Sequence, residues 1–208
     1  MADPQRKREA REAKQDLYRQ LILTAAEFVF AEKGYDQAKM DEIARESGLS
    51  PGTVYTVFKG KADVFQALHK AGDAELLRRG IEFAQGLEDP FELLLAGIRG
   101  YLDYFLTHPN FLRMHLLEGF TWGTEQSGAD NSGRTDAWKS GIKILALSIE
   151  RCIEAEIFHP GDPEILARMM IAMQQVQLAH WVENGMERDP EVVINEIETQ
   201  LRRSFCLR

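Results

Sequence analysis

The sequence predicts an all-α fold, and three observations lead to it. Apolar residues recur at helical spacing along almost the whole chain, and no segment alternates apolar and polar residues as a half-buried strand would. Only seven prolines are available to interrupt long helices. Hydrophobic residues make up 44% of the 208 residues and charged residues 28%, which is ordinary for a globular protein with its own core.

Composition also limits the class of protein. No apolar run approaches the roughly 20 residues that span a bilayer, so no membrane partner is expected. The N-terminal residues, MADPQRKREAREAKQD, lack an apolar signal region, which predicts a cytoplasmic protein. Cys152 and Cys206 lie far apart and fit no metal spacing, so reduced thiols are expected, with no metal site and no cofactor. The net charge is −8, and the acidic excess lies after residue 62.

Three helices are expected before residue 60. The first covers about residues 10–33, where apolar residues keep helical spacing, and Gly34 ends it. A short helix at about 40–46 and another at about 51–57 follow, with the turn Ser47-Gly48-Leu49 between them. A helix of two turns is unstable alone, so the third needs caps and tertiary packing.

Residues in and beside this third helix can supply both the cap and the tertiary packing. The hydroxyl of Ser50 can accept a hydrogen bond from the first turn, and Pro51 stands where its missing N–H costs nothing. Val54 and Phe58 can pack the helix onto its neighbours, and Lys59-Gly60 then breaks the chain.

Six further helices are expected after residue 60. Breaks are indicated at Asp89-Pro90, His108-Pro109, His159-Pro160-Gly161 and Asp189-Pro190, and residues 119–133, rich in Gly, Ser and Asn, are expected to form a loop. The expected helices cover about 61–85, 90–107, 110–118, 134–157, 162–184 and 190–206. The chain therefore divides into a three-helix domain at 1–60 and a six-helix bundle at 61–208.

Two short helices joined by a glycine turn make a helix-turn-helix, whose second helix can enter the DNA major groove. In residues 50–61, SPGTVYTVFKGK, the glycine lets the backbone approach phosphates, and hydroxyl, phenol and ammonium groups suit bases or phosphates. A purely structural helical corner would share this geometry. The candidate DNA-binding residues here are Ser50, Gly52, Thr53, Tyr55, Thr56, Lys59 and Lys61.

One set of residues in this region carries a family resemblance. In order, the set is Ala25-Ala26, Phe30, Gly34-Tyr35, Ile43-Ala44, Gly48-Leu49-Ser50, Pro51-Gly52-Thr53, Tyr55, Phe58 and Lys61. With these residues at the family's spacing, residues 19–65 resemble the N-terminal domain of the TetR (tetracycline-repressor-like) transcription regulators. The resemblance covers about a quarter of the chain, and the later part matches only in length, helix content and order.

The resemblance implies a homodimeric, ligand-responsive repressor of palindromic operator DNA rather than an enzyme. The positions that would contact DNA are Gly52, Thr53, Tyr55 and Lys61. Two positions depart from the family pattern. Lys39 stands where the family usually has Thr or Ser, and it joins the candidates because its ammonium could bind a phosphate. Val57 stands where the family often has His or Tyr and cannot hydrogen-bond.

The resemblance also implies that a mostly apolar small molecule enters the C-terminal bundle and shifts the helix at about 61–85, which changes the spacing of the two reading helices. Aromatic and thioether side chains suit such a ligand, although ordinary core packing uses the same residues. The candidate ligand-binding residues are Tyr101, Phe105, His115, Trp122, Trp138, Met173 and Gln177.

The last two helices, at about 162–184 and 190–206, would pair with those of a second copy if the family pattern holds. Their apolar residues are otherwise core faces, and both alternatives stay open. The residues concerned are Ile165, Met169, Ala172, Met173, Val176 and His180, then Val193, Ile197, Leu201 and Phe205.

Other functions stay open. The chain could be a small-molecule-binding helical dimer without DNA binding, or a purely structural dimer. It could also be a helical enzyme that uses His115 with Glu118, three residues apart as metal ligands can be. The basic segment Arg6–Arg19 is either an arm that reaches DNA or a solvated helix extension.

Overall fold

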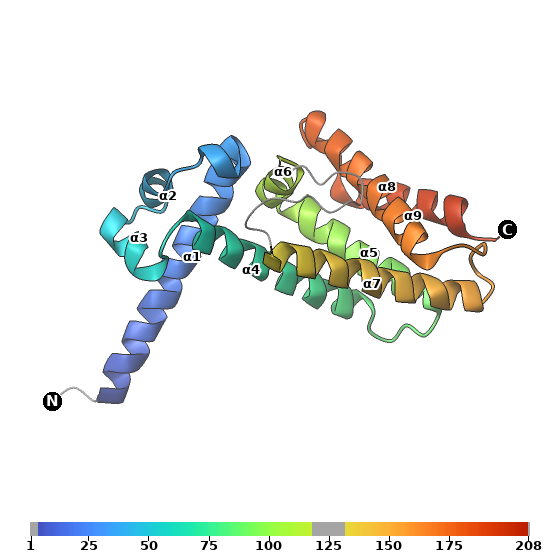
Figure 1. The fold of residues 1–208 in the computed structure, drawn as a ribbon, viewed down its shortest axis with the longest axis horizontal. Coiled ribbons are helices and arrows are strands. Elements are labelled where there is room, and N and C mark those ends of the chain that lie inside the picture. Colours follow the sequence, from blue (N-terminus) through green and yellow to red (C-terminus); the bar gives the residue numbers. More distant parts are fainter. Residues whose placement is uncertain (1–3, 118–131, 208) are drawn as a thin grey trace. The chain divides into compact units, whose positions relative to one another are not determined.

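The computed structural model describes residues 4–117 and 132–207, with backbone alone at residues 4 and 132–138, and these residues form an all-α fold (Figure 1). The helices are α1 Pro4–Gln37, α2 Met40–Glu46, α3 Pro51–Val57, α4 Lys61–Phe83, α5 Pro90–Thr107, α6 Pro109–Leu117, α7 Ser132–Glu154, α8 Pro163–Glu183 and α9 Pro190–Phe205. The one extended contact between described residues is an antiparallel bridge from Phe158 to Cys206. The predicted all-α class and helix order are confirmed.

Two compact units divide the chain: the head unit, Met1–Ala71, and the body unit, Gly72–Arg208. This division lies inside α4, later than the boundary predicted at residue 60. The first turns of α4 belong to the head because they share its core. The Phe65 ring of α4 lies edge-on to the Phe30 ring of α1, with 5.3 Å between ring centroids.

The head unit is built from α1, α2 and α3, each of which packs against the other two. α1 begins at Pro4, ahead of the predicted start near residue 10. At Gly34 the backbone leaves helical geometry with φ 73°, a conformation that glycine adopts readily, so the predicted stop is present as a kink. The largest buried side chains of its three helices are Ile22, Phe30, Ile43 and Val54.

Three helices of the body unit begin at Asp-Pro pairs. Asp89, Asp162 and Asp189 are the N-caps of α5, α8 and α9, and each carboxylate accepts backbone N–H groups of the first turn. In α5, Asp89 Oδ1 lies 2.9 Å from the amide nitrogen of Phe91 and 3.0 Å from that of Glu92. The proline that follows each Asp removes one N–H that would otherwise lack a partner.

α5 is the central helix of the body unit. It packs against α6, α7 and α9, and α8 packs against α6, α7 and α9. The buried side chains of α5 include Phe91, Leu94, Leu95, Ile98, Leu102 and Phe105. The predicted loop at 119–133 lies outside the described residues except for its last two, which begin α7.

Candidate functional site

The short helix α3 is held in place by its cap and by two apolar side chains. Ser50 has extended backbone geometry, and its Oγ accepts a hydrogen bond from the Thr53 amide at 3.2 Å. Pro51 is the first helical residue. Val54 is fully buried and Phe58 is almost fully buried, so α3 is anchored on one face. The cap and the anchors predicted for this helix are therefore present.

The other face of α3 points to solvent. Tyr55 is 52% exposed, and Gly52, Thr56 and Lys59 are exposed as well. A Cβ added to Gly52 would have only Ser50 Oγ nearby, at 3.9 Å, so nothing in the fold requires a glycine there. Because Gly52 has no side chain, the backbone of α3 is accessible from solvent at this position.

The two threonine hydroxyls of α3 are already engaged within the helix. Thr53, half-buried, has its Oγ1 2.9 Å from Ser50 Oγ. Thr56 Oγ1 donates to the Thr53 carbonyl oxygen at 2.6 Å. A hydroxyl that donates to its own helix still offers lone pairs, so both can accept a hydrogen bond from a partner.

The lysines beside α3 differ in their surroundings. Lys61 Nζ donates to the carbonyl oxygens of Tyr35 at 2.6 Å and Asp36 at 3.1 Å, and it lies 4.4 Å from the centroid of the Tyr35 ring. Lys61 therefore joins the start of α4 to the end of α1, a role that the sequence did not indicate. Lys59 is exposed, and Lys39, the N-cap residue of α2, is exposed and makes no side-chain capping bond.

In the body unit, three of the predicted ligand-binding residues lie together. The Tyr101 and Phe105 rings of α5 are 4.6 Å apart between centroids, and the His115 ring of α6 lies 4.8 Å from that of Phe105. Burial raises the pKa of Tyr101 above its ordinary value of 10.0, so its phenol stays protonated. Trp122 and the side chain of Trp138 lie outside the described residues, as does Glu118, the proposed partner of His115.

The other two predicted ligand-binding residues lie on α8. Met173 is half-buried. Gln177 Nε2 donates to Gln200 Oε1 of α9 at 2.5 Å, so this amide ties two helices of the bundle together.

α8 distributes its side chains in an unusual way. It buries Gln174, 3% exposed, and Gln175, 8% exposed, on the inner side. On its outer side Ile165 is 57% exposed, Met169 54% and Val176 48%. Gln177 is a candidate from the sequence, and Gln175, two residues away, is not. The adjacent glutamines in an otherwise apolar helix were the available signal.

The four apolar residues singled out on α9 in the sequence are core. Val193, Ile197, Leu201 and Phe205 are all buried within the single chain, where α9 packs on α5. For these four residues the structure supports the core alternative, so the exposed apolar residues of this pair of helices lie mainly on α8.

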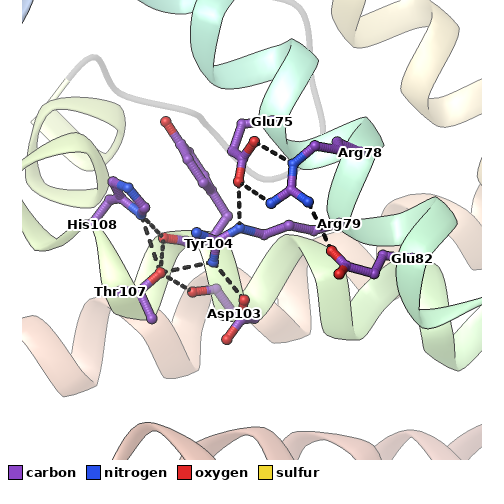
Figure 2. Close-up of polar contacts among 8 residues, drawn as sticks. All are labelled: Glu75, Arg78, Arg79, Glu82, Asp103, Tyr104, Thr107 and His108. Atoms are coloured by element: carbon purple, nitrogen blue, oxygen red, sulfur yellow. Dashed lines mark hydrogen bonds and ion pairs between the residues drawn. The ribbon is translucent and has the colours of Figure 1, made fainter.

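Polar contacts join the second half of α4 to α5 (Figure 2). Arg79 of α4 donates through Nη1 to Asp103 Oδ2 at 2.5 Å and to Thr107 Oγ1 at 2.9 Å. Its Nε donates to Glu75 Oε1 at 3.0 Å, and its guanidinium lies 5.4 Å from the centroid of the Tyr104 ring. A single arginine thus engages side chains on both helices.

Glycines in the body unit allow α5 and α6 to approach α4 very closely. A Cβ at Gly100 of α5 would lie 2.5 Å from the backbone nitrogen of Gly80 of α4, which is too close for any side chain. A Cβ at Gly72, the first residue of the body unit, would lie 2.5 Å from Cζ of Phe111 on α6. Gly97, one turn before Gly100, has no atom near its added Cβ.

Two further features are absent from the residues that the structure describes. No group of three or more His, Cys, Asp or Glu side chains there is arranged to hold a metal ion. No helix in the same ranges is both long enough and apolar enough to cross a membrane.

Comparisons with known proteins identify the family. The sequence profile of the bacterial regulatory proteins of the tetR family matches residues 22–68, which include α2, α3 and the start of α4. The fatty acid metabolism regulator protein of Bacillus subtilis (strain 168) is 38% identical over 186 residues, which cover 88% of this chain and 93% of that protein. The chain belongs to the TetR family.

Two further similar proteins are named as transcriptional regulators. The transcriptional repressor BepR of Brucella suis biovar 1 (strain 1330) is 33% identical over 169 residues, covering 79% of this chain and 80% of that protein. The crystal structure of FadR from Bacillus subtilis in complex with stearoyl-CoA shares the fold, with a TM-score of 0.74 and 24% identity over 88% of this chain and 96% of that one. The chain is therefore a transcriptional regulator with a helix-turn-helix and not an enzyme.

Proposed function

We propose that this TetR-family regulator is a homodimeric repressor that binds palindromic operator DNA and leaves it when a long-chain fatty acyl thioester binds in the body unit. The observation that carries the DNA half of the proposal is α3. Its Tyr55 and Gly52 face solvent, and Val54 and Phe58 hold it from beneath. As a DNA-binding regulator, the protein would work in the cytoplasm.

The expected DNA contacts fall into two groups. Gly52, Thr53, Tyr55 and Thr56 would meet base edges and the nearest backbone atoms, where they give sequence preference. Lys39 and Lys59, both exposed, would meet phosphates, with Ser50 at the helix start beside them. Lys61 would act mainly by holding α4 to α1, because two carbonyl oxygens already accept from its ammonium.

The effector class rests on the relatives and on the aromatic cluster of the body unit. One relative is named a fatty acid metabolism regulator, and one structural neighbour was solved with stearoyl-CoA. The rings of Tyr101, Phe105 and His115 meet between α5 and α6, and aromatic surroundings of this kind would suit an acyl chain.

A second copy is the proposed partner of the outer face of α8. Ile165, Met169 and Val176 recur at helical spacing and would form a continuous apolar stripe on this helix. A two-fold axis lets the same stripe on a second chain cover it. Such a dimer would present two copies of α3 to successive major grooves, about 34–36 Å apart.

α4 is the proposed connection between effector and DNA, because the head and body units divide within it. In the body unit its backbone at Gly72 meets the Phe111 ring, and that ring lies 5.8 Å from the Phe105 ring of the aromatic cluster. An effector that moved this cluster would displace Phe111 and bias α4. The differential affinity of the effector for the two conformers sets the coupling, typically about 1–3 kcal/mol.

Fluorescence anisotropy with duplex DNA from upstream of the chain's own gene tests the proposal. We expect binding that weakens steeply as salt rises, because phosphate contacts release counterions. Stearoyl-CoA should release the DNA, and coenzyme A without an acyl chain should not. If stearoyl-CoA raises the melting temperature but no DNA complex forms even at low salt, the chain is instead a small-molecule-binding dimer without DNA binding.

A further inference from the structure

The inner side of α8 holds two of the three polar side chains that are buried among the described residues. These are Gln174 and Gln175; the third, His69, belongs to the head unit. Burial of an amide in an apolar interior is unfavourable unless its hydrogen bonds are made. A buried glutamine in the middle of an apolar helix therefore needs an explanation.

Gln175 stands out because its amide nitrogen has no acceptor. Within the described part of the chain, no atom accepts a hydrogen bond from Gln175 Nε2, and that atom is sealed from solvent. A methionine of similar length would fill the same space without burying a hydrogen-bond donor that has no acceptor. The arrangement costs stability in the ligand-free chain, typically about 1–3 kcal/mol for such a group.

The direction in which Gln175 points can be derived from the helix. Residues two apart on an α-helix are separated by about 200° around its axis. Gln177 faces α9, because its amide bonds Gln200 of that helix. Gln175 therefore lies on the flank of α8 that faces away from α9, and the other helices that pack against α8 are α6 and α7.

From these observations we infer that Gln175 donates a hydrogen bond to the acyl carbonyl oxygen of the effector, within the body unit beside α8. This inference rests on the proposed function, since it assigns one polar contact to the proposed acyl thioester. An amide N–H needs an acceptor and no charge, and a thioester carbonyl supplies one within an otherwise apolar ligand. A long chain with its carbonyl at Gln175 would bury the donor that the ligand-free protein leaves unpaired.

α8 would then have two partners on opposite sides. Its apolar outer stripe would meet a second copy, and its inner amide would meet the effector. Both partners would lie outside the chain, and this would account for the exposed Ile165 and Met169 and for the buried Gln175.

The test compares two probes on the full-length protein. One is stearoyl-CoA; the other is its thioether analogue, in which a CH2 group replaces the carbonyl. Their affinities are measured by isothermal titration calorimetry for the natural protein, for Gln175→Met and for Gln85→Met. The last is the matched control, because Gln85 is an exposed glutamine of the body unit, after the end of α4.

We expect the natural protein and Gln85→Met to bind the thioester about tenfold more tightly than the thioether. Gln175→Met should bind the two equally. Without ligand, Gln175→Met should also melt about 2–4 °C higher, because the stranded donor is gone. A lower melting point would show that Gln175 has a structural partner and would overturn the inference.

The outcomes separate this inference from the proposed function. If the natural protein binds neither probe, the acyl effector is wrong, and the inference falls with it. If the natural protein binds both probes but its preference survives in Gln175→Met, or if it has no preference, only the inference is overturned. A bound water at Gln175 that stays in place on binding would give this second result.

Discussion

On α3 of the head unit polar side chains face solvent and Val54 is buried, whereas α8 of the body unit buries two glutamines among its apolar core residues and exposes large apolar side chains. The outward Tyr55 of α3 contrasts with the inward Gln175 of α8, and the buried Val54 contrasts with the exposed Ile165. An ordinary amphipathic helix needs only its own protein beneath it. A helix that also exposes large apolar side chains and buries an amide nitrogen without an acceptor points to further partners, one on each of these two surfaces.

The largest effect should come from breaking the body unit at its closest contact. Gly100→Ala places a Cβ 2.5 Å from the Gly80 nitrogen, and neither backbone can move without separating α4 from α5. We expect the free energy of unfolding to fall by about 2–4 kcal/mol in a denaturant titration.

Gly97→Ala is the matched control, since its added Cβ meets nothing. It should be neutral or stabilising by up to about 1 kcal/mol, because alanine favours helix more than glycine does. Equal stability of the two variants would mean that α4 and α5 do not approach so closely in solution.

The head unit should respond in DNA affinity and not in stability. Tyr55→Ala removes an exposed phenol, so operator affinity should fall about tenfold in an anisotropy titration. The free energy of unfolding should change by less than about 0.5 kcal/mol. Phe28→Ala, which removes an exposed aromatic ring from α1, should leave DNA affinity unchanged. A large loss of stability in Tyr55→Ala would place this side chain in the core of the head.

Lys59 and Lys61, on either side of Gly60 between α3 and α4, should differ in what they contribute to stability and to DNA binding. Lys61→Ala removes the hydrogen bonds to the Tyr35 and Asp36 carbonyl oxygens, so it should lower stability by about 1 kcal/mol. Lys59→Ala should leave stability unchanged and should reduce the slope of log affinity against log salt by about 1. A reduced slope in Lys61→Ala would show that its ammonium also reaches a phosphate.

The smallest effect should come from a half-buried carboxylate on α4. The Arg78 guanidinium, with that of Arg79, holds the pKa of Glu75 at about 2, below its ordinary 4.5. A lowered pKa stabilises the folded state above pH 4.5, and the contribution disappears as the pH falls through 2. Glu75→Gln should therefore melt slightly lower at pH 7 and no differently near pH 2. A difference that grew on acidification would contradict this assignment.

How far the sequence could predict these features depends on how local their causes are. The caps at Ser50 and Asp89 act over two or three residues, so the short helix α3 and the start of α5 could be predicted. Lys61 bonds carbonyl oxygens 25 and 26 residues earlier, which only the folded head brings within reach.

The inner face of the body unit was the hardest part to predict. Gln175 and Gln177 are two positions apart, yet they lie on opposite flanks of α8. Which flank faces α9 is known only from the folded bundle, where Gln177 bonds Gln200. The apolar residues of α9 fitted both a core and a dimer interface, and burial of Ile197 and Leu201 within one chain decides for the core. DNA binding is common to the regulators of this family, whereas their effectors differ from one regulator to another. We therefore expect the family resemblance in α3 and not in α8.

The Ser50 cap, the Pro51 that follows it and the two anchors beneath have one more consequence for how the protein searches a genome. They make α3 a rigid template before it meets DNA, so little conformational entropy is lost on docking. A preformed template also adapts poorly to a near-match. Discrimination between operators would then come from fast rejection of imperfect sites rather than from slow adjustment to correct ones.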